Sequence, residues 1–174
     1  MNLSTTVPTP AGPLTIVASD EGAVRAAGFT ADADRLRELL PRPWRLAPAP
    51  RRDLGDISKA VEAYLAGDHT ALDQVPVEPR PGAVGTPAAG GFLSQAWQAL
   101  RRIPPGQTLT YTQLAAAAGR PAAVRAAANA CARNPIALIV PCHRVLRTDG
   151  GLGGYRWGTA VKGWLLAHEG APGR

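Results

Sequence analysis

The sequence has few cysteines and few histidines. Its 174 residues include two cysteines, Cys131 and Cys142, and three histidines. Two cysteines do not make a disulfide framework, and the histidines do not complete the four-ligand spacing of a structural zinc site. The sequence therefore predicts a protein in a reduced, cytoplasmic setting, with no metal site and no cofactor.

Long hydrophobic runs are also missing. The longest strongly apolar run, Ile136–Val140, is far shorter than the roughly 20 residues that a membrane span needs. The N-terminal MNLSTTVPTP has neither the basic nor the apolar region of a signal peptide. Apolar residues make up 45% of the chain, which is enough for a globular core. We expect a globular protein that does not contact a membrane.

Acidic residues are nearly absent from the second half. Residues 1–87 carry nine basic and eleven acidic side chains, whereas residues 88–174 carry ten basic and only two acidic ones, Asp149 and Glu169. Such a basic half is typical of a surface that binds a polyanion such as nucleic acid. Codon bias is the alternative, because 17 of the 19 basic residues are arginine. That bias explains arginine over lysine, but it does not explain the missing acids.

The charge changes sign at a stretch rich in proline and glycine, which predicts a linker over residues 78–91. We expect a structural domain over residues 1–77 and a second domain over residues 92–174. Turn-rich sequences separate the apolar runs of the first domain, and these predict an antiparallel meander followed by two helices. The expected strands are Leu3–Val7, Leu14–Ser19 and Ala23–Phe29, and the expected helices are Asp32–Leu40 and Leu54–Ala66, the latter with Asp53 as N-cap.

The second domain is predicted to be mostly helical. After a helix over Phe92–Arg101, Thr110 and Gln113 fit a capping box that begins a helix ending at Gly119. Pro121 then fits the first turn of a helix over about Ala122–Ala132, and the pair makes a helix-turn-helix candidate. This last helix is rich in alanine, which suits close approach to another backbone, although helix propensity alone could explain it.

Cys142 is the candidate nucleophile. The run Ile136–Val140 predicts a buried strand or extended segment that leads directly to Cys142, His143 and Arg144. A thiolate is the reactive form of cysteine, and cationic or hydrogen-bonding neighbours favour it. An inert core cysteine is the alternative, and it is the interpretation we prefer for Cys131. A glycine-rich loop over Arg147–Tyr155 and a helix over Trp157–His168 complete the domain.

The segment NPIALIVPCHRV closely resembles the active-site segment of the O6-alkylguanine-DNA alkyltransferases. The resemblance covers Phe92–Gly170, including AGRPAAVRAAANACARNP and GGYRWGTAVKGWLLAHEG, and it extends more weakly to TPAGPLTIVASDEGAVRAAGF near the N-terminus. It implies an α+β fold of two domains, an N-terminal ribonuclease-H-like domain and a C-terminal winged helix-turn-helix domain. It also implies a monomer whose partner is double-stranded DNA containing O6-alkylguanine.

The resemblance also implies roles for individual residues. Cys142 matches the cysteine that accepts the alkyl group irreversibly, once per molecule. His143 matches the histidine that helps to deprotonate it through water, and Glu169 matches the carboxylate that orients this histidine. Asn134 matches the asparagine that braces the active-site turn. Tyr111 matches the tyrosine that assists nucleotide flipping and hydrogen-bonds the base.

Further positions are expected at the DNA surface and in the substrate pocket. Arg125 matches the arginine that fills the gap left by the flipped base, an extrusion that chemistry on a stacked base requires. The expected DNA contacts are Arg125, Tyr111, Ala126, Ala127, Arg133 and Arg144. The expected pocket residues are Val145, Tyr155, Arg156, Trp157 and Ala137. The pair Arg156-Trp157 departs from the glycine that the family can have there, and Pro105 replaces a common aromatic residue. We expect Trp157 to narrow the pocket, so that methyl groups react better than benzyl-sized groups.

Three alternatives remain open at this stage. A non-catalytic alkyltransferase-like protein binds the damaged base but lacks the cysteine, and a helix-turn-helix regulator would need neither Cys142 nor Glu169. A cysteine hydrolase usually takes its histidine from a distant part of the sequence rather than from the next residue. The substrate range within repair, O6-methylguanine alone or O4-methylthymine as well, is likewise open.

Overall fold

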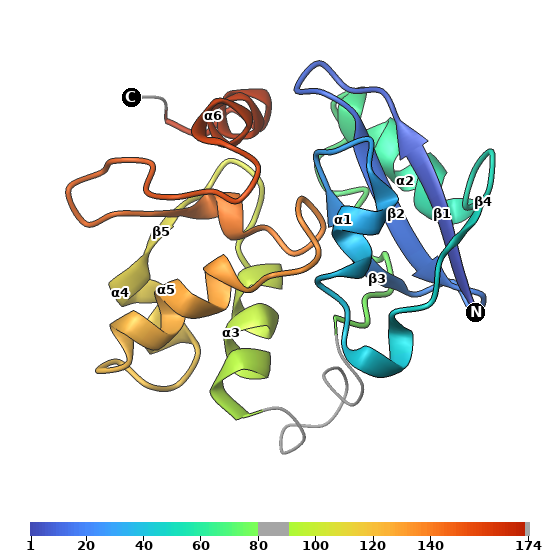
Figure 1. Ribbon diagram of the computed structural model, residues 1–174. Helices are drawn as coiled ribbons and strands as arrows, with labels where there is room; N and C mark the ends of the chain where they lie inside the picture. The colour runs from blue at the N-terminus through green and yellow to red at the C-terminus, as the bar shows by residue number, and fades with distance from the viewer. Residues whose placement is uncertain (80–90, 173–174) are drawn as a thin grey trace. The chain divides into compact units, whose positions relative to one another are not determined.

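The computed structural model describes residues 1–79 and 91–172 (Figure 1). Most of the predicted linker, residues 80–90, lies outside the described residues. Contacts divide the described chain into two compact units. Residues 1–79 and Pro135–Ile139 form the first unit, and residues 91–134 and 140–172 form the second. The segment Pro135–Ile139 thus belongs to the first unit although it follows the linker in the sequence.

A four-stranded sheet forms the centre of the first unit, in the order β3-β2-β1-β4. Strands β1, β2 and β3 pair antiparallel, as the meander predicted, and β4 adds to β1 in parallel. Every residue of β2 is buried, so this strand lies within the core. The strands are β1 (Asn2–Val7), β2 (Leu14–Ser19), β3 (Val24–Gly28) and β4 (Ala49–Pro50).

Two α-helices and a 3₁₀ turn complete this unit: α1 (Ala33–Arg37), η1 (Arg42–Trp44) and α2 (Asp56–Leu65). Asp32 caps α1 by accepting from the backbone N–H of Asp34. The predicted cap of α2 is wrong, because Gly55 is the N-cap and Asp53 lies outside the helix. The Asp53 carboxylate accepts instead from the Gly55 N–H at 2.8 Å, and Gly55 takes a φ of +62° that favours glycine.

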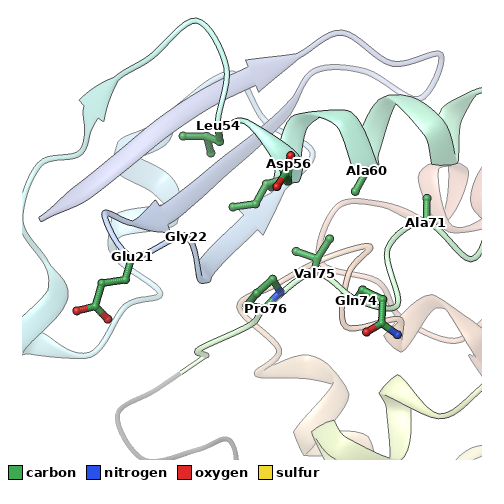
Figure 2. A pocket seen from close by; sticks show the side chains of 10 residues that line it. Glu21, Gly22, Leu54, Asp56, Ala60, Ala71, Gln74, Val75 and Pro76 are labelled. Atoms are coloured by element: carbon green, nitrogen blue, oxygen red, sulfur yellow. The ribbon is translucent and has the colours of Figure 1, made fainter.

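A hollow of about 580 Å³ lies beside the N-terminal end of α2 (Figure 2). Leu54, Ala60 and Val75 give it apolar walls, and its only carboxylates are those of Glu21 and Asp56. None of the residues predicted to carry chemistry lines it.

The second unit is mostly helical, and the α+β fold class is confirmed. Its elements are α3 (Gly91–Arg101), β5 (Leu109–Thr110), α4 (Tyr111–Ala117), α5 (Val124–Ala132), η2 (Cys142–Arg144), β6 (Val145–Leu146) and α6 (Thr159–His168). The capping box is confirmed, with Thr110 and Gln113 bonding each other's backbone N–H. Helix α5 begins later than predicted, at Val124, because residues 120–123 form a turn closed by the Ala123 N–H and the Arg120 carbonyl.

The apolar run before Cys142 is buried, as predicted, but it is not a strand. Only Ile136 makes a bridge, with Ala27, and residues 137–139 form a turn. Leu138 adopts a φ of +70°, a left-handed conformation that is uncommon for a residue with a branched side chain. The turn therefore changes the direction of the chain immediately before the candidate nucleophile. None of the helices in the two described ranges is both long and apolar enough to cross a membrane.

Candidate active site

Cys142 begins the short 3₁₀ turn η2, and the residue is only 8% exposed. Its Sγ accepts a hydrogen bond of 3.3 Å from Nδ2 of Asn134, which also donates to the Val140 carbonyl at 2.8 Å. Burial raises the pKa of the Cys142 thiol, while the Asn134 hydrogen bond and the charge of Lys162 act to lower it. The buried thiol therefore needs a base to become a thiolate.

His143, the next residue, is fully buried and is the candidate for this base. Its Nε2 lies 2.9 Å from Oε1 of Glu169, an acceptor, so Nε2 carries the proton of the neutral ring. Nδ1 is buried and has no hydrogen-bond partner among the described residues. Burial lowers the pKa of His143, although Glu169 acts in the opposite direction. The ring is therefore neutral near pH 7, with a lone pair on Nδ1.

Glu169 is the C-cap of α6, and its side chain is fully buried. Burial alone would raise the pKa of this carboxyl, but hydrogen bonds from His143 and Arg144 outweigh burial and lower it well below its usual range. The carboxylate is therefore ionised throughout the physiological range. The sequence separates Glu169 from His143 by 26 positions, and the fold brings them into contact.

Arg144 is placed differently from the prediction. Its side chain is only 5% exposed, and the guanidinium grips Glu169 with two hydrogen bonds, Nε to Oε2 at 2.9 Å and Nη2 to Oε1 at 2.8 Å. Its Nη1 donates to the Ile103 carbonyl at 2.6 Å. A guanidinium committed in this way is not available to a DNA phosphate. This placement does not support the expected DNA contact of Arg144.

Lys162 is a functional candidate that the sequence analysis missed. The residue is fully buried on α6, and its Nζ donates to the carbonyls of Val145 and Leu152. Burial lowers the pKa of Lys162, whereas the neighbouring cysteines raise it. The signal was present in the sequence, since this is one of two lysines and lies among the apolar residues of the last helix.

Tyr111 is the first residue of α4 and is half-buried. Burial raises the pKa of its hydroxyl, and the electrostatic influence of Cys131 and Cys142 adds to this. The glycine-rich loop lies close to it, because a Cβ on Gly153 would come within 3.0 Å of the Tyr111 hydroxyl. A protonated phenol, a suitable donor, thus lies within electrostatic range of the candidate nucleophile.

Arg125 and Ala126 are exposed in the first turn of α5, and Arg133 is exposed at its C-cap. Ala127 is fully buried, so its side chain is not part of this surface, and its placement does not support the expected contact with DNA. Asn129, one helical turn after Arg125, is exposed and was missed. The exposed face of α5 thus consists of small side chains around a few long polar ones.

The five expected pocket residues fall into three groups. Val145 is buried in β6, while Tyr155 and Trp157 are half-buried in the loop before α6. Arg156 is exposed, and its Nη2 donates to the Ala132 carbonyl at 2.5 Å. Ala137 belongs to the first unit, where its N–H donates to the Ala27 carbonyl. None of the five lines the cavity of about 410 Å³ beside β5 and β6, which is lined instead by residues such as Leu146 and Leu152.

Comparison with known proteins gives a family match over the second part of the chain and relatives that match nearly all of it. A family profile described as the DNA-binding domain of 6-O-methylguanine DNA methyltransferase matches residues 91–171. The methylated-DNA–protein-cysteine methyltransferase of Salmonella typhimurium is 41% identical over 167 residues, covering 94% of this chain and 93% of that protein. The chain belongs to the methylated-DNA–protein-cysteine methyltransferase family.

Solved structures of this family show the same fold. The crystal structure of Mycobacterium tuberculosis O6-methylguanine methyltransferase matches with a TM-score of 0.75 and 31% identity, covering 99% of this chain and 96% of that one. The M. tuberculosis protein solved in complex with DNA matches with a TM-score of 0.74 and 31% identity, covering 97% and 94% of the two chains. In this member of the family, no three His, Cys, Asp or Glu side chains of the described residues are grouped to hold a metal ion.

The Asn134 contact with sulfur gives a first prediction. Asn134→Ala removes the donor that helps to lower the pKa of Cys142, so the pKa of the thiol should rise further above its usual value. Alkylation of Cys142 by iodoacetamide, followed by mass spectrometry against pH, should therefore need a higher pH by about one unit, the scale of one lost hydrogen bond to a thiolate. An unchanged pH profile in a folded variant would contradict this role of Asn134.

Proposed function

We propose that the chain repairs DNA by accepting the alkyl group of O6-alkylguanine on Sγ of Cys142. The observation that carries the proposal is the arrangement of one hydrogen-bond donor on the thiol and a buried histidine base in the next residue. Asn134 donates to Sγ, and His143, oriented by Glu169, has an acceptor nitrogen on its other side. A buried cysteine of purely structural role would need none of these groups.

The reaction is a displacement at the alkyl carbon. The thiol proton passes to Nδ1 of His143 by way of water, and the thiolate forms an S–C bond while the C–O6 bond breaks. The electron pair of that bond stays on the guanine, which gains a proton from Tyr111. The product is a thioether, which no group in the chain can cleave, so each molecule acts once. Cys142 must enter as a free thiol, and a reducing cytoplasmic setting is therefore part of the proposal.

Double-stranded DNA containing O6-alkylguanine is the proposed substrate, bound by a monomer. The alkyl carbon is inaccessible in a stacked duplex, so the nucleotide has to be rotated out of the helix. The exposed face of α5 suits this step, because its alanines allow close approach and Arg125 is long enough to enter the base stack. Contacts with phosphates hold the protein without reading the sequence, as a search for rare damage requires.

Intact-protein mass spectrometry tests this proposal against its alternatives. The protein is incubated with an excess of a duplex oligonucleotide carrying one O6-methylguanine, and an undamaged duplex serves as the control. We expect each chain to gain one methyl group and then to stop reacting. Binding of the damaged duplex without a mass gain would indicate a non-catalytic damage-binding protein. Equal binding of both duplexes without a mass gain would indicate a regulator.

The size of the alkyl group gives a second prediction. Trp157 is a bulky, half-buried residue two positions after Tyr155, where a smaller residue would leave more room. We expect Trp157→Gly to react faster with free O6-benzylguanine, by about tenfold, the scale of about 1.4 kcal/mol of relieved steric contact. The variant should keep its reaction with O6-methylguanine in DNA. A benzylguanine rate no higher than that of the wild type would contradict the predicted narrowing of the pocket.

A further inference from the structure

Arg144 makes more contacts with Glu169 than any role in packing requires. Its guanidinium meets the carboxylate with two parallel hydrogen bonds, the geometry that gives the strongest arginine–carboxylate pairs. Its third bond, to the Ile103 carbonyl, fixes the guanidinium from the other side. The same Oε1 that Arg144 contacts also accepts the bond from His143 at 2.9 Å. Arg144, Glu169 and His143 thus form one continuous buried network.

Glu169 lies in a place that is unfavourable for a negative charge. Its side chain is fully buried, and it is the C-cap of α6, where the helix dipole is itself negative. A buried carboxylate without a cationic partner tends to take up a proton. Without such a partner, Glu169 and neutral His143 would together carry a net negative charge, which favours uptake of one proton by the pair and hence a charged His143 beside the carboxylate. A permanent cation beside Glu169 removes this driving force, because arginine does not lose its proton in proteins.

We propose that Arg144 is a positioning residue that holds Glu169 as a permanent carboxylate and thereby keeps His143 neutral, with its lone pair on Nδ1. The proposal rests on the function proposed above, because a neutral His143 is the base that accepts the proton of Cys142. No hydrogen bond joins Arg144 to the Cys142 thiol or to the His143 ring. It acts by balancing the charge of Glu169, so that the network is neutral as a whole.

The charged groups around His143 agree with this role. Glu169 faces its ring from the end of α6, Arg144 follows it in η2, and Lys162 lies on α6. Burial lowers the pKa of His143 most, Glu169 raises it, and both Arg144 and Lys162 lower it. Loss of Arg144 would leave the Glu169 charge uncompensated, so the pKa of His143 should rise. The base would then stay protonated, and therefore inactive, up to a higher pH.

The first test uses the wild-type protein. The chain is labelled with ¹⁵N-histidine, its three histidines are assigned, and the ring nitrogens are followed by NMR from pH 5 to pH 8. We expect His143 to be neutral over pH 6–8, protonated at Nε2 and unprotonated at Nδ1. A His143 ring that is charged at pH 7, or protonated at Nδ1, would overturn the proposal. This measurement needs neither DNA nor alkyl transfer, so a failure of this proposal can be distinguished from a failure of the proposed function.

The second test uses substitutions at Arg144. Arg144→Gln should move the acidic limb of the pH–rate profile for O6-methylguanine repair upward by about one unit, with a matching rise in the pKa of His143 by NMR. Arg144→Lys keeps the charge and should restore most of the wild-type profile. Arg25→Gln is the matched control, since it breaks a partly buried Arg–Glu pair of 3.2 Å, with Glu78, in the first unit. It should leave the acidic limb in place.

A double substitution separates charge from structure. If Arg144 acts through Glu169, then Arg144→Gln should shift the limb much less in a Glu169→Gln background than in the wild type. The comparison is made on proteins whose circular dichroism matches the wild type. Two results would overturn the proposal. One is an equal shift of the acidic limb of the pH–rate profile in the two backgrounds. The other is an Arg144→Gln variant whose acidic limb does not move while its thermal stability falls. If Arg144→Gln does not fold, the wild-type titration and Arg144→Lys still decide it.

Discussion

Cys142→Ser is expected to abolish alkyl transfer while leaving DNA binding intact. The substitution replaces a soft sulfur nucleophile by a hydroxyl that His143 can scarcely deprotonate, at nearly the same volume. The rate of methyl transfer from an O6-methylguanine duplex should fall by at least about four orders of magnitude, the scale on which enzymes respond to loss of their nucleophile. Rapid-quench assays measure the rate, and fluorescence anisotropy with the same duplex measures binding.

Cys131→Ser is the matched control for this experiment. Cys131 lies near the end of α5 and is partly buried. Among the described residues, no side chain donates to its sulfur as Asn134 donates to that of Cys142. Burial, with a further contribution from Cys142, raises the pKa of the Cys131 thiol far above its usual value. The rate of methyl transfer by Cys131→Ser should therefore match that of the wild type. Transfer that survives in Cys142→Ser but disappears in Cys131→Ser would contradict the assignment of the nucleophile.

Arg125→Ala is expected to have the next largest effect on the rate of alkyl transfer. The loss should appear only with substrates whose damaged base must leave a base stack. Arg125 is exposed on α5, and its neighbours Val124 and Ala126 have side chains too short to replace it. Extruding a paired nucleotide costs a few kcal/mol, and an inserted side chain offsets part of this. Loss of about 2–4 kcal/mol corresponds to a roughly 30- to 1,000-fold slower transfer from duplex DNA at saturating protein.

A single-stranded oligonucleotide carrying the same O6-methylguanine provides the internal comparison for Arg125→Ala. Flipping costs least in a single strand, so the variant should recover most of the wild-type rate there. The ratio of duplex to single-strand rates, measured for both proteins by quench-flow, isolates the flipping step from the chemistry. Equal losses on the two substrates would place Arg125 in the chemical step or in general affinity instead.

Local features of this molecule could be predicted from the sequence because their causes are local. The capping box of Thr110 and Gln113 and the strand Leu14–Ser19 depend on neighbouring residues only. The pairing of Cys142 with His143 as candidates likewise required no long-range information. Glu169 and Asn134 entered through the family resemblance, since their sequence neighbours show nothing of their contacts with His143 and Cys142.

The sequence was least informative where distant parts of the chain meet. The run Ile136–Val140 was expected to be a buried strand or extended segment, but only Ile136 pairs, with Ala27 more than 100 positions earlier, and Leu138 then turns the chain. Arg144 was expected to contact DNA, as one of the positions taken from the family resemblance. Its charge is instead neutralised by Glu169, a contact that the sequence separates by 25 positions. Ala127 was expected on the same surface, but the packing of α5 turns it inward.

The central claim, that Sγ of Cys142 accepts the alkyl group, is tested most directly by locating a labelled methyl group. The protein is reacted with a duplex whose O6-methylguanine carries a ¹³C-methyl, then digested with trypsin and analysed by tandem mass spectrometry. The two cysteines fall in different peptides, since arginines at positions 125, 133 and 144 separate them. We predict one labelled methyl group per chain, on Cys142 in the peptide 134–144. A label on Cys131, or no label on a protein that binds the duplex, would contradict the account.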